Sequence, residues 1–198
     1  MKKRIFFDKF AEMKFISHLD MLRFADRLLK KAHIPMKYSQ GFHPRPKISL
    51  GNPISLGTEA YNELMDIELC EPMSNEEVLR RLNEAEVPGF HVSKIETITD
   101  KRSIVDIYTN ALFEISGEKQ EIDKLDELFS RDEIIETKEK KGKITQRNLG
   151  ERVISYTRDG DIIKLELVNT SPNSFLILAK VDVKDVKIVK RGYNIKNI

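Results

Sequence analysis

The same order of strand-like and helix-like segments occurs twice along this chain, and this repetition is the strongest limit on its fold. In the first half, Ser17 and Ser74 stand as helix N-caps, with Asp20 and Glu77 three residues later as in a capping box. Runs of branched and aromatic residues flank both helices. The first half therefore predicts strands at 3–10, 47–50, 61–70 and 91–99, and helices at 18–31 and 74–85.

The second half follows the same order. Ile122, Leu125, Leu128 and Phe129 share one side of a helix expected at 119–130. We expect strands at 105–116, 133–138, 161–168 and 183–191, and a short helix at 172–181. A β-α-β-β-α-β order is that of the ferredoxin-like plait. The predicted fold class is therefore α+β, with two tandem ferredoxin-like domains packed together, residues 1–100 and 101–198.

Composition excludes several other classes of protein. The 198 residues contain no apolar run of the ~18 residues that a membrane span needs, and Ile5-Phe6-Phe7 is too short for a secretory signal. Cys70 is the single cysteine, which excludes an internal disulfide and a cysteine-rich metal or iron–sulfur site in this chain. Nucleotide-binding, hydrolase and zinc-protease motifs do not occur. We expect a cytoplasmic protein with no membrane partner, no metal and no cofactor.

The charge is distributed unevenly along the chain. Residues 1–50 hold twelve Lys/Arg and four Asp/Glu, a net formal charge of +8, whereas the whole chain carries +2. The remaining residues therefore carry −6. Such an asymmetry indicates an anionic partner for the first segment. The alternative is that acidic residues elsewhere in the chain pack against this segment within the fold.

Residues 38–47, Tyr-Ser-Gln-Gly-Phe-His-Pro-Arg-Pro-Lys, form the densest cluster of unusual residues. Two prolines stiffen the backbone, Phe42 offers a ring for stacking, and Arg45 and Lys47 offer charges for phosphates. Proteins bind single-stranded RNA with these residue types. The alternative is a rigid connector whose Phe42 is buried and whose charges face water.

A second candidate site lies at the start of the first helix. Arg23 and Arg27 follow Asp20 at three- and four-residue steps, so they share one helix face, and His18 stands at the N-terminus, where backbone N–H groups favour anions. The same spacing also fits a solvated, ion-paired face. A metal site of His18, Asp20 and His43 would need these residues to converge in the fold. His18 and His43 are the candidate catalytic residues if the protein cleaves RNA, because imidazole titrates near neutral pH.

Another basic stretch runs from Lys138 to Arg147. It contains five Lys/Arg residues and is too polar for the core. We expect either an auxiliary contact with phosphates or a solvated hairpin.

Two long segments resemble the radical SAM-linked (radical SAM-associated) family. They are Phe15-Ile16-Ser17-His18-Leu19-Asp20, with Arg23 and Arg27 after it, and the stretch from Tyr38 to Ser49. This bacterial domain of unknown function occurs fused to, or encoded beside, a radical SAM protein. The resemblance implies such a protein as the partner and a role near RNA or ribosome modification. A radical SAM enzyme holds its cluster with three cysteines, so this chain would be a stand-alone form that lacks that activity.

We therefore expect an RNA-binding module that assists a separate RNA- or ribosome-modifying enzyme and is not an enzyme on its own. Phe42 would stack on a base, His18 and His43 would donate hydrogen bonds, and Tyr38 would lie in the same surface. Phosphate contacts would come from Arg23, Arg27, Arg45 and Lys47. One alternative is a metal-independent ribonuclease that uses His18 and His43, by analogy of fold alone. Another is a protein–protein adaptor that docks a radical SAM partner.

Overall fold

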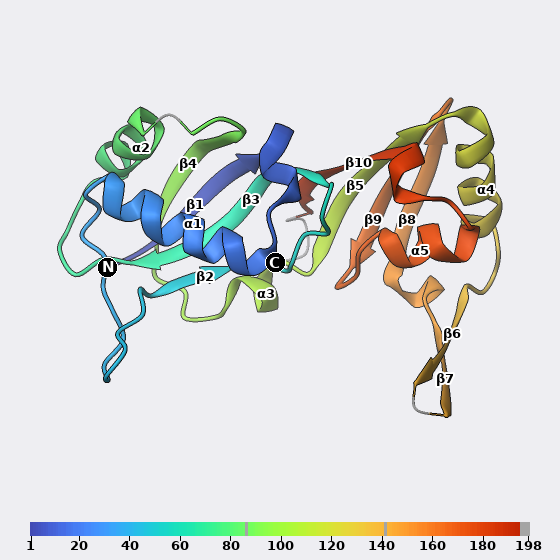
Figure 1. Cartoon of the computed structure of the whole chain (residues 1–198), viewed down its shortest axis with the longest axis horizontal. Coiled ribbons are helices and arrows are strands. Elements are labelled where there is room, and N and C mark those ends of the chain that lie inside the picture. Colours follow the sequence, from blue (N-terminus) through green and yellow to red (C-terminus); the bar gives the residue numbers. More distant parts are fainter. Residues whose placement is uncertain (86, 141, 195–198) are drawn as a thin grey trace. The chain divides into compact units, whose positions relative to one another are not determined.

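The computed structural model of the chain describes residues 1–85, 87–140 and 142–194. The structure is mixed α+β, and its described part contains five α-helices and mostly antiparallel strands (Figure 1). The chain divides into two compact units between Tyr108 and Thr109. Among the described residues, no helix is both long and apolar enough to cross a membrane.

Unit 1 is built around the strand β1 (Lys2–Lys9), which lies between β3 (Glu59–Glu68) and β4 (Phe90–Ile98) and is antiparallel to both. The short strand β2 (Ile48–Leu50) pairs with β3, so the strand order is β4-β1-β3-β2. Helix α1 (His18–Lys31) connects β1 to β2, and α2 (Asn75–Glu84) connects β3 to β4. Every strand and helix predicted in residues 1–100 is confirmed, with bounds that shift by no more than two residues.

Both long helices of unit 1 begin at the predicted caps. The Oγ atom of Ser17 accepts a hydrogen bond from the Asp20 N–H at 3.1 Å, and that of Ser74 accepts one from the Glu77 N–H at 3.2 Å. Each bond satisfies an N–H group that the first helical turn leaves without an intrahelical partner. The sequence therefore determines where each helix starts as well as which side it buries.

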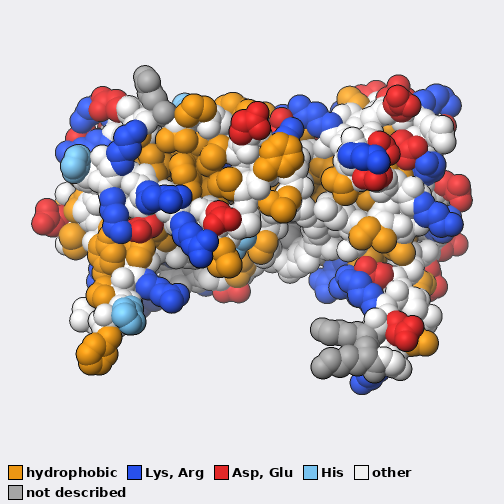
Figure 2. All heavy atoms as spheres, viewed as in Figure 1, with side chains coloured by type: hydrophobic (Ala, Val, Ile, Leu, Met, Phe, Trp, Pro, Cys, Tyr) orange, Lys and Arg blue, Asp and Glu red, His pale blue; other side chains and the backbone are white. Residues whose placement is uncertain are grey.

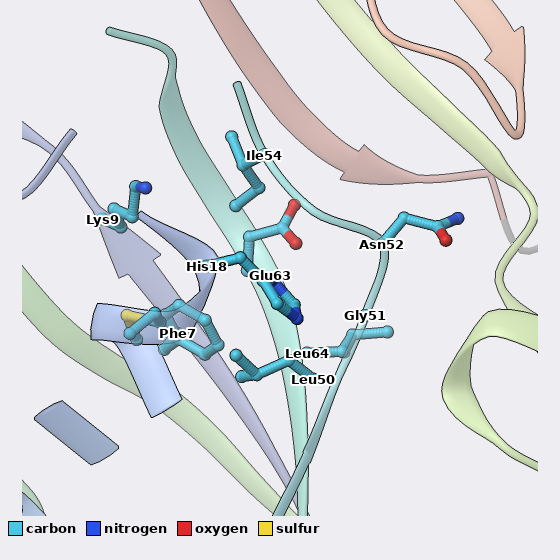
Figure 3. Close-up of a pocket in the computed structure, with 10 residues that line it drawn as sticks. Phe7, Lys9, His18, Leu50, Gly51, Asn52, Ile54, Glu63 and Leu64 are labelled. Carbon is cyan, nitrogen blue, oxygen red and sulfur yellow. The ribbon is translucent and has the colours of Figure 1, made fainter. Parts of the chain in front are cut away.

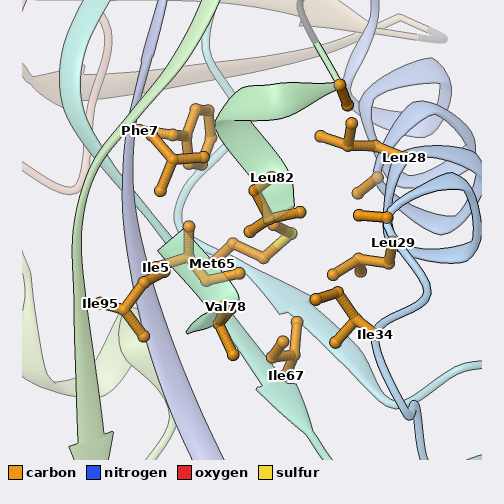
Figure 4. Close-up of a cluster of buried hydrophobic side chains, with 14 of the residues drawn as sticks. Ile5, Phe7, Leu28, Leu29, Ile34, Met65, Ile67, Val78, Leu82 and Ile95 are labelled. Atoms are coloured by element: carbon orange, nitrogen blue, oxygen red, sulfur yellow. The ribbon is translucent and has the colours of Figure 1, made fainter. Parts of the chain in front are cut away.

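The core of unit 1 fills the space between these helices and one face of the sheet. Side chains of β1 and β3 point toward α1 and α2 (Figure 4). Burying a large apolar side chain stabilises the native state by about 1.5–3 kcal/mol. Helix α1 contributes a buried stripe to this core, which consists of Met21, Ala25, Leu28 and Leu29.

The opposite side of β1 carries a buried ion pair, because successive side chains of a strand point to opposite faces. Arg4 is 4% exposed, and its Nε and Nη2 atoms donate to the Asp66 carboxylate at 2.8 and 2.9 Å. Its Nη1 atom donates to the Tyr108 hydroxyl at 3.1 Å. Helix α3 (Ile104–Ile107) precedes Tyr108 and packs against β3. The ion pair and α3 thus exclude solvent from this part of the sheet.

Unit 2 contains a four-stranded antiparallel arrangement in the order β10-β5-β9-β8. Helices α4 (Lys119–Phe129) and α5 (Asn173–Ala179) supply apolar side chains to its core, where the rings of Phe129 and Phe175 lie 5.2 Å apart. All four predicted core residues of α4 are buried. The strands are β5 (Asn110–Gly117), β8 (Val153–Asp159), β9 (Ile162–Val168) and β10 (Val186–Tyr193).

Two expectations for the second half need correction, and one strand was not expected. The strand expected at 105–116 starts only at Asn110, because Ser103 caps the short helix α3 before it. The segment expected as a strand at 133–138 does not join the unit 2 sheet; it contributes to β6 (Ile135–Lys140), which pairs only with β7 (Lys143–Asn148) in a separate hairpin. The sheet position expected for it is taken by β8, which was not predicted.

We expect the replacement Asp66→Ala to lower the free energy of unfolding by about 3–5 kcal/mol, because it leaves the Arg4 guanidinium buried without its carboxylate. Urea denaturation measures this. The matched control is Glu84→Ala, which removes an exposed carboxylate from Arg80 and should cost less than about 1 kcal/mol. Equal losses for the two variants would contradict a desolvated pair.

Candidate functional site

Residues 37–47 form a narrow projecting loop between α1 and β2 (Figure 1), which we call the 37–47 loop. Backbone hydrogen bonds close its base and middle: the Lys47 N–H donates to the Lys37 carbonyl at 2.9 Å, and the Ser39 N–H donates to the Arg45 carbonyl at 2.8 Å. The Arg45 N–H donates to Ser39 Oγ at 2.9 Å. Gly41 has a φ of +129°, which strongly favours glycine. The loop is therefore a stiff, hairpin-like projection.

The end of this loop presents an aromatic ring and positive charge to solvent. Phe42 is fully exposed, and His43 and Arg45 are exposed beside it. Within the described part of the chain, the side chains of His43 and Arg45 have no hydrogen-bond or ion-pair partner. Figure 2 shows hydrophobic atoms at the end of the projection, with a histidine and basic side chains above them. The expected alternative of a buried Phe42 is thereby wrong.

The base of the loop is held by the remaining predicted residues. Tyr38 is half-buried against the unit 1 core, and the Lys30 ammonium lies 5.9 Å from the centre of its ring. Lys37 and Lys47 share the Glu68 carboxylate, at 3.7 and 3.2 Å. Tyr38 and Lys47 therefore anchor the loop. The single Glu68 carboxylate does not balance both Lys37 and Lys47, so the base of the loop keeps a net positive charge.

The exposed side of α1 adds basic residues next to this base. Arg23, Arg27 and Lys30 follow one another at four- and three-residue steps and so form a stripe along the helix. Arg23 pairs with Asp20 at 2.9 Å, as the ion-paired interpretation expects, and Lys30 pairs with Asp26 at 2.7 Å. The Arg27 guanidinium forms no hydrogen bond or salt bridge with any of the described residues. Figure 2 shows Lys and Arg side chains gathered over this face.

His18 belongs to a different place, a small pocket in unit 1 (Figure 3). The first turn of α1, strands β1 and β3, and the segment after β2 surround it. The cavity has about 20 Å³, enough for a single water molecule. Its polar lining consists of Lys9, His18, Asn52 and Glu63.

Two charged residues of this pocket are buried. Lys9 and Glu63 are each 2% exposed, and the Lys9 ammonium donates to the Ile16 carbonyl at 3.3 Å. Burial lowers the pKa of Lys9, and the nearby Glu63 carboxylate opposes that shift. Burial also lowers the pKa of His18, and the positive charge of Lys9 adds to the effect. The pocket thus combines a carboxylate, an ammonium and an imidazole that favours its neutral form.

Neither Lys9 nor Glu63 was among the predicted site residues, although the sequence carries a signal for both. Lys9 continues the alternate, helix-facing series of Ile5 and Phe7, and Glu63 stands two residues before Met65 in the corresponding series of β3. A charged residue at an inward position of a strand is rarely buried without a partner. The inward positions of Lys9 and Glu63 in the alternation of their strands would therefore have identified both residues.

The structure does not bring His18 and His43 together. His18 opens α1, whereas His43 lies beyond the other end of that 14-residue helix, which is about 20 Å long. Asp20 is occupied with Ser17 and Arg23. No group of three His, Cys, Asp or Glu residues with metal-binding geometry occurs in the described ranges. A metal site of His18, Asp20 and His43 therefore has no geometric basis.

A family described as "Uncharacterized protein conserved in bacteria" (DUF2344) matches residues 2–187 of the chain. A comparison with curated proteins found no match. The matched range includes the 37–47 loop, the stripe on α1 and the His18 pocket.

We expect His18 to titrate below the ordinary histidine pKa of 6.5. Since the unfolded chain then binds the proton more readily, the stability due to neutral His18 is complete above about pH 6.5 and is lost as pH falls through the folded pKa. The replacement Lys9→Met removes a positive charge beside the imidazole and should raise the His18 pKa. NMR titration of the His18 ring measures both effects.

The matched control for this titration is Arg23→Met, which removes an exposed positive charge on the same helix. It should leave the His18 midpoint close to that of the unmodified protein, because an exposed charge is screened by solvent. A midpoint that stays constant or falls in Lys9→Met would contradict the described pocket.

Proposed function

The chain belongs to the bacterial DUF2344 family, whose description assigns no activity, and we propose that it is an RNA-binding module. The 37–47 loop is its contact surface, with the stripe on α1 as an extension. The observation that carries the proposal is the fully exposed Phe42 ring beside the unpartnered Arg45 guanidinium on a stiff loop. Phe42 stacks on an unpaired base, and Arg45, Arg27 and Lys47 contact phosphates.

Two physical arguments support RNA as the ligand. A lone exposed aromatic ring contributes nothing to the core, whereas base stacking on such a ring is worth about 1–3 kcal/mol per base. The loop contains Lys37, Arg45 and Lys47 and no acidic residue, so its formal charge is +3. Positive charge beside a ring favours a ligand that has both a π-face and phosphates.

Many proteins bind RNA on the open face of a β-sheet, but the corresponding face of β1 in unit 1 is covered. RNA-binding sheets present exposed aromatic residues on their central strands. Here the face of β1 opposite the core carries the buried Arg4–Asp66 pair, and Tyr108 covers it. The 37–47 loop offers a ring to a base at a place away from this sheet face, through the fully exposed Phe42.

The finer assignment of the fold is part of this proposal. We regard each unit as a ferredoxin-like domain. The support is the antiparallel strand order β4-β1-β3-β2 in unit 1 and β10-β5-β9-β8 in unit 2, each with two connecting helices.

The partner is proposed to be a separate RNA- or ribosome-modifying enzyme, and its class is proposed to be radical SAM. The chain has one cysteine, Cys70, so the three thiolates of such a cluster would come from the partner. The protein then delivers RNA and performs no chemistry of its own.

The two alternatives have less support. A ribonuclease with a paired acid and base needs His18 and His43 in one site, and they lie at opposite ends of α1. Incubation with labelled RNA in EDTA tests the ribonuclease alternative. Cleavage that is lost in His18→Ala and in His43→Ala would support this alternative. An adaptor would bind its partner protein directly. In that case a pull-down would survive ribonuclease treatment, whereas an RNA-mediated contact would be lost.

The replacement Phe42→Ala should weaken binding to an unstructured RNA of about ten nucleotides by about 1–3 kcal/mol, because one stacked base is lost. Fluorescence anisotropy measures the dissociation constant. The matched control is Phe15→Ala, which removes another exposed ring of unit 1 and should leave affinity unchanged. Equal affinities for the native protein and Phe42→Ala would exclude stacking by this ring.

The replacement Arg45→Ala should reduce the slope of log K against log salt by about 0.7, the value for one phosphate contact on a single strand. The control Arg80→Ala removes an exposed arginine that Glu77 and Glu84 already hold, so its slope should stay that of the native protein. A salt-independent affinity in the native protein would sink the RNA proposal as a whole.

A further inference from the structure

The two units carry a projection at the same point of their topology. Unit 1 runs β1, α1, the 37–47 loop, β2, β3, α2 and β4. Unit 2 runs β5, α4, the hairpin of β6 and β7, β8, β9, α5 and β10. Each sheet places its first strand between its third and fourth strands, with the second strand beside the third. The β6–β7 hairpin therefore corresponds to the 37–47 loop, since both follow the first long helix and precede the second strand.

The two projections also share their charge. Residues 135–148 contain five Lys/Arg and two Glu, a formal charge of +3, the same as that of residues 37–47. Within the hairpin, Lys138 and Arg147 both pair with Glu136, which is 7% exposed. One carboxylate faces two cations there, as Glu68 faces Lys37 and Lys47 at the base of the loop.

An exposed apolar side chain lies near the end of each projection. Ile144 is 66% exposed and follows the exposed Lys143 at the beginning of β7. The hairpin forms a two-stranded sheet of its own, outside the core of unit 2. Two isolated strands are marginally stable in water. Ile144 lies outside the core of unit 2 and is exposed, so it is available for a ligand.

We infer that the β6–β7 hairpin is a second RNA contact, equivalent to the 37–47 loop. The inference rests on the proposed function and assigns it a ligand class, an unpaired RNA strand long enough to occupy both projections. Lys143 and Arg147 contact phosphates, and Ile144 packs against a base. Two linked contacts on one strand raise affinity far beyond that of either contact alone.

The test compares short and long RNA. The hairpin variant is Lys143→Gln with Ile144→Ala, and its matched control is Lys184→Gln with Val183→Ala, a neighbouring exposed pair elsewhere in unit 2. Binding is measured with unstructured RNAs of about ten and about forty nucleotides. Thermal unfolding of each variant checks that the fold is intact.

For the long RNA, we expect the hairpin variant to bind at least about tenfold more weakly than the native protein, while the control binds normally. A ten-nucleotide RNA contacts one projection at a time, so loss of the hairpin should weaken its binding less than that of the long RNA. The ratio of the affinity for the long RNA to the affinity for the short RNA should therefore fall in the hairpin variant. If the hairpin variant keeps native affinity and Phe42→Ala loses it, this inference is wrong and the proposed function stands. If the native protein binds neither RNA, both are wrong.

Discussion

The burial of charged residues on β1 is the constraint on which unit 1 depends. The strand has neighbours on both sides, and burying an unpaired charge costs several kcal/mol. Each of its buried charges therefore meets a polar group from another element. Arg4 is held by Asp66 on β3 and by Tyr108 after α3. The two lysines reach the helices: Lys3 donates to Asn75 in α2 and to Thr97, and Lys9 donates to the carbonyl of Ile16 just before α1. These contacts connect β1 to the rest of the unit through directional bonds as well as apolar packing.

Local signals predicted most of the first half because each one has a direct physical cause. Capping serines determine where α1 and α2 begin, and alternation determines which side of β3 is buried. The second half was harder for two reasons. Helix α3 is a single turn, too short to show a helical period. Strand β8 has exposed residues at most positions and no fully buried one, so no buried face marks it in the sequence.

The sequence predicts which residues make up the candidate site, but it does not predict which of them face solvent and which anchor the loop. Proline, glycine, ring and charge within ten residues indicated the 37–47 loop. Which side chains face solvent depends on the hydrogen bonds of Ser39 and on the packing of Tyr38, and neither is visible in the sequence. The convergence of His18 with Lys9 and Glu63 depends on the register of β1 against β3, where Phe7 lies opposite Glu63. Long-range pairing of this kind cannot be worked out from spacing along the chain.

The positive charge of the first fifty residues lies partly on residues paired with carboxylates of β3 and partly on exposed residues that form no salt bridge in the described part of the chain. Much of it is neutralised within unit 1 by the acidic strand β3: Asp66 takes Lys2 and Arg4, and Glu68 takes Lys37 and Lys47. Each of these carboxylates faces two cations, so the attraction of this part for an anionic partner is reduced but not cancelled. Arg27 in the stripe and Arg45 in the loop form no salt bridge with the described residues and are exposed, so solvent and salt screen their charge within about 10 Å. The attraction is therefore local, and it selects a ligand that brings phosphates close to the Phe42 ring rather than any distant anionic surface.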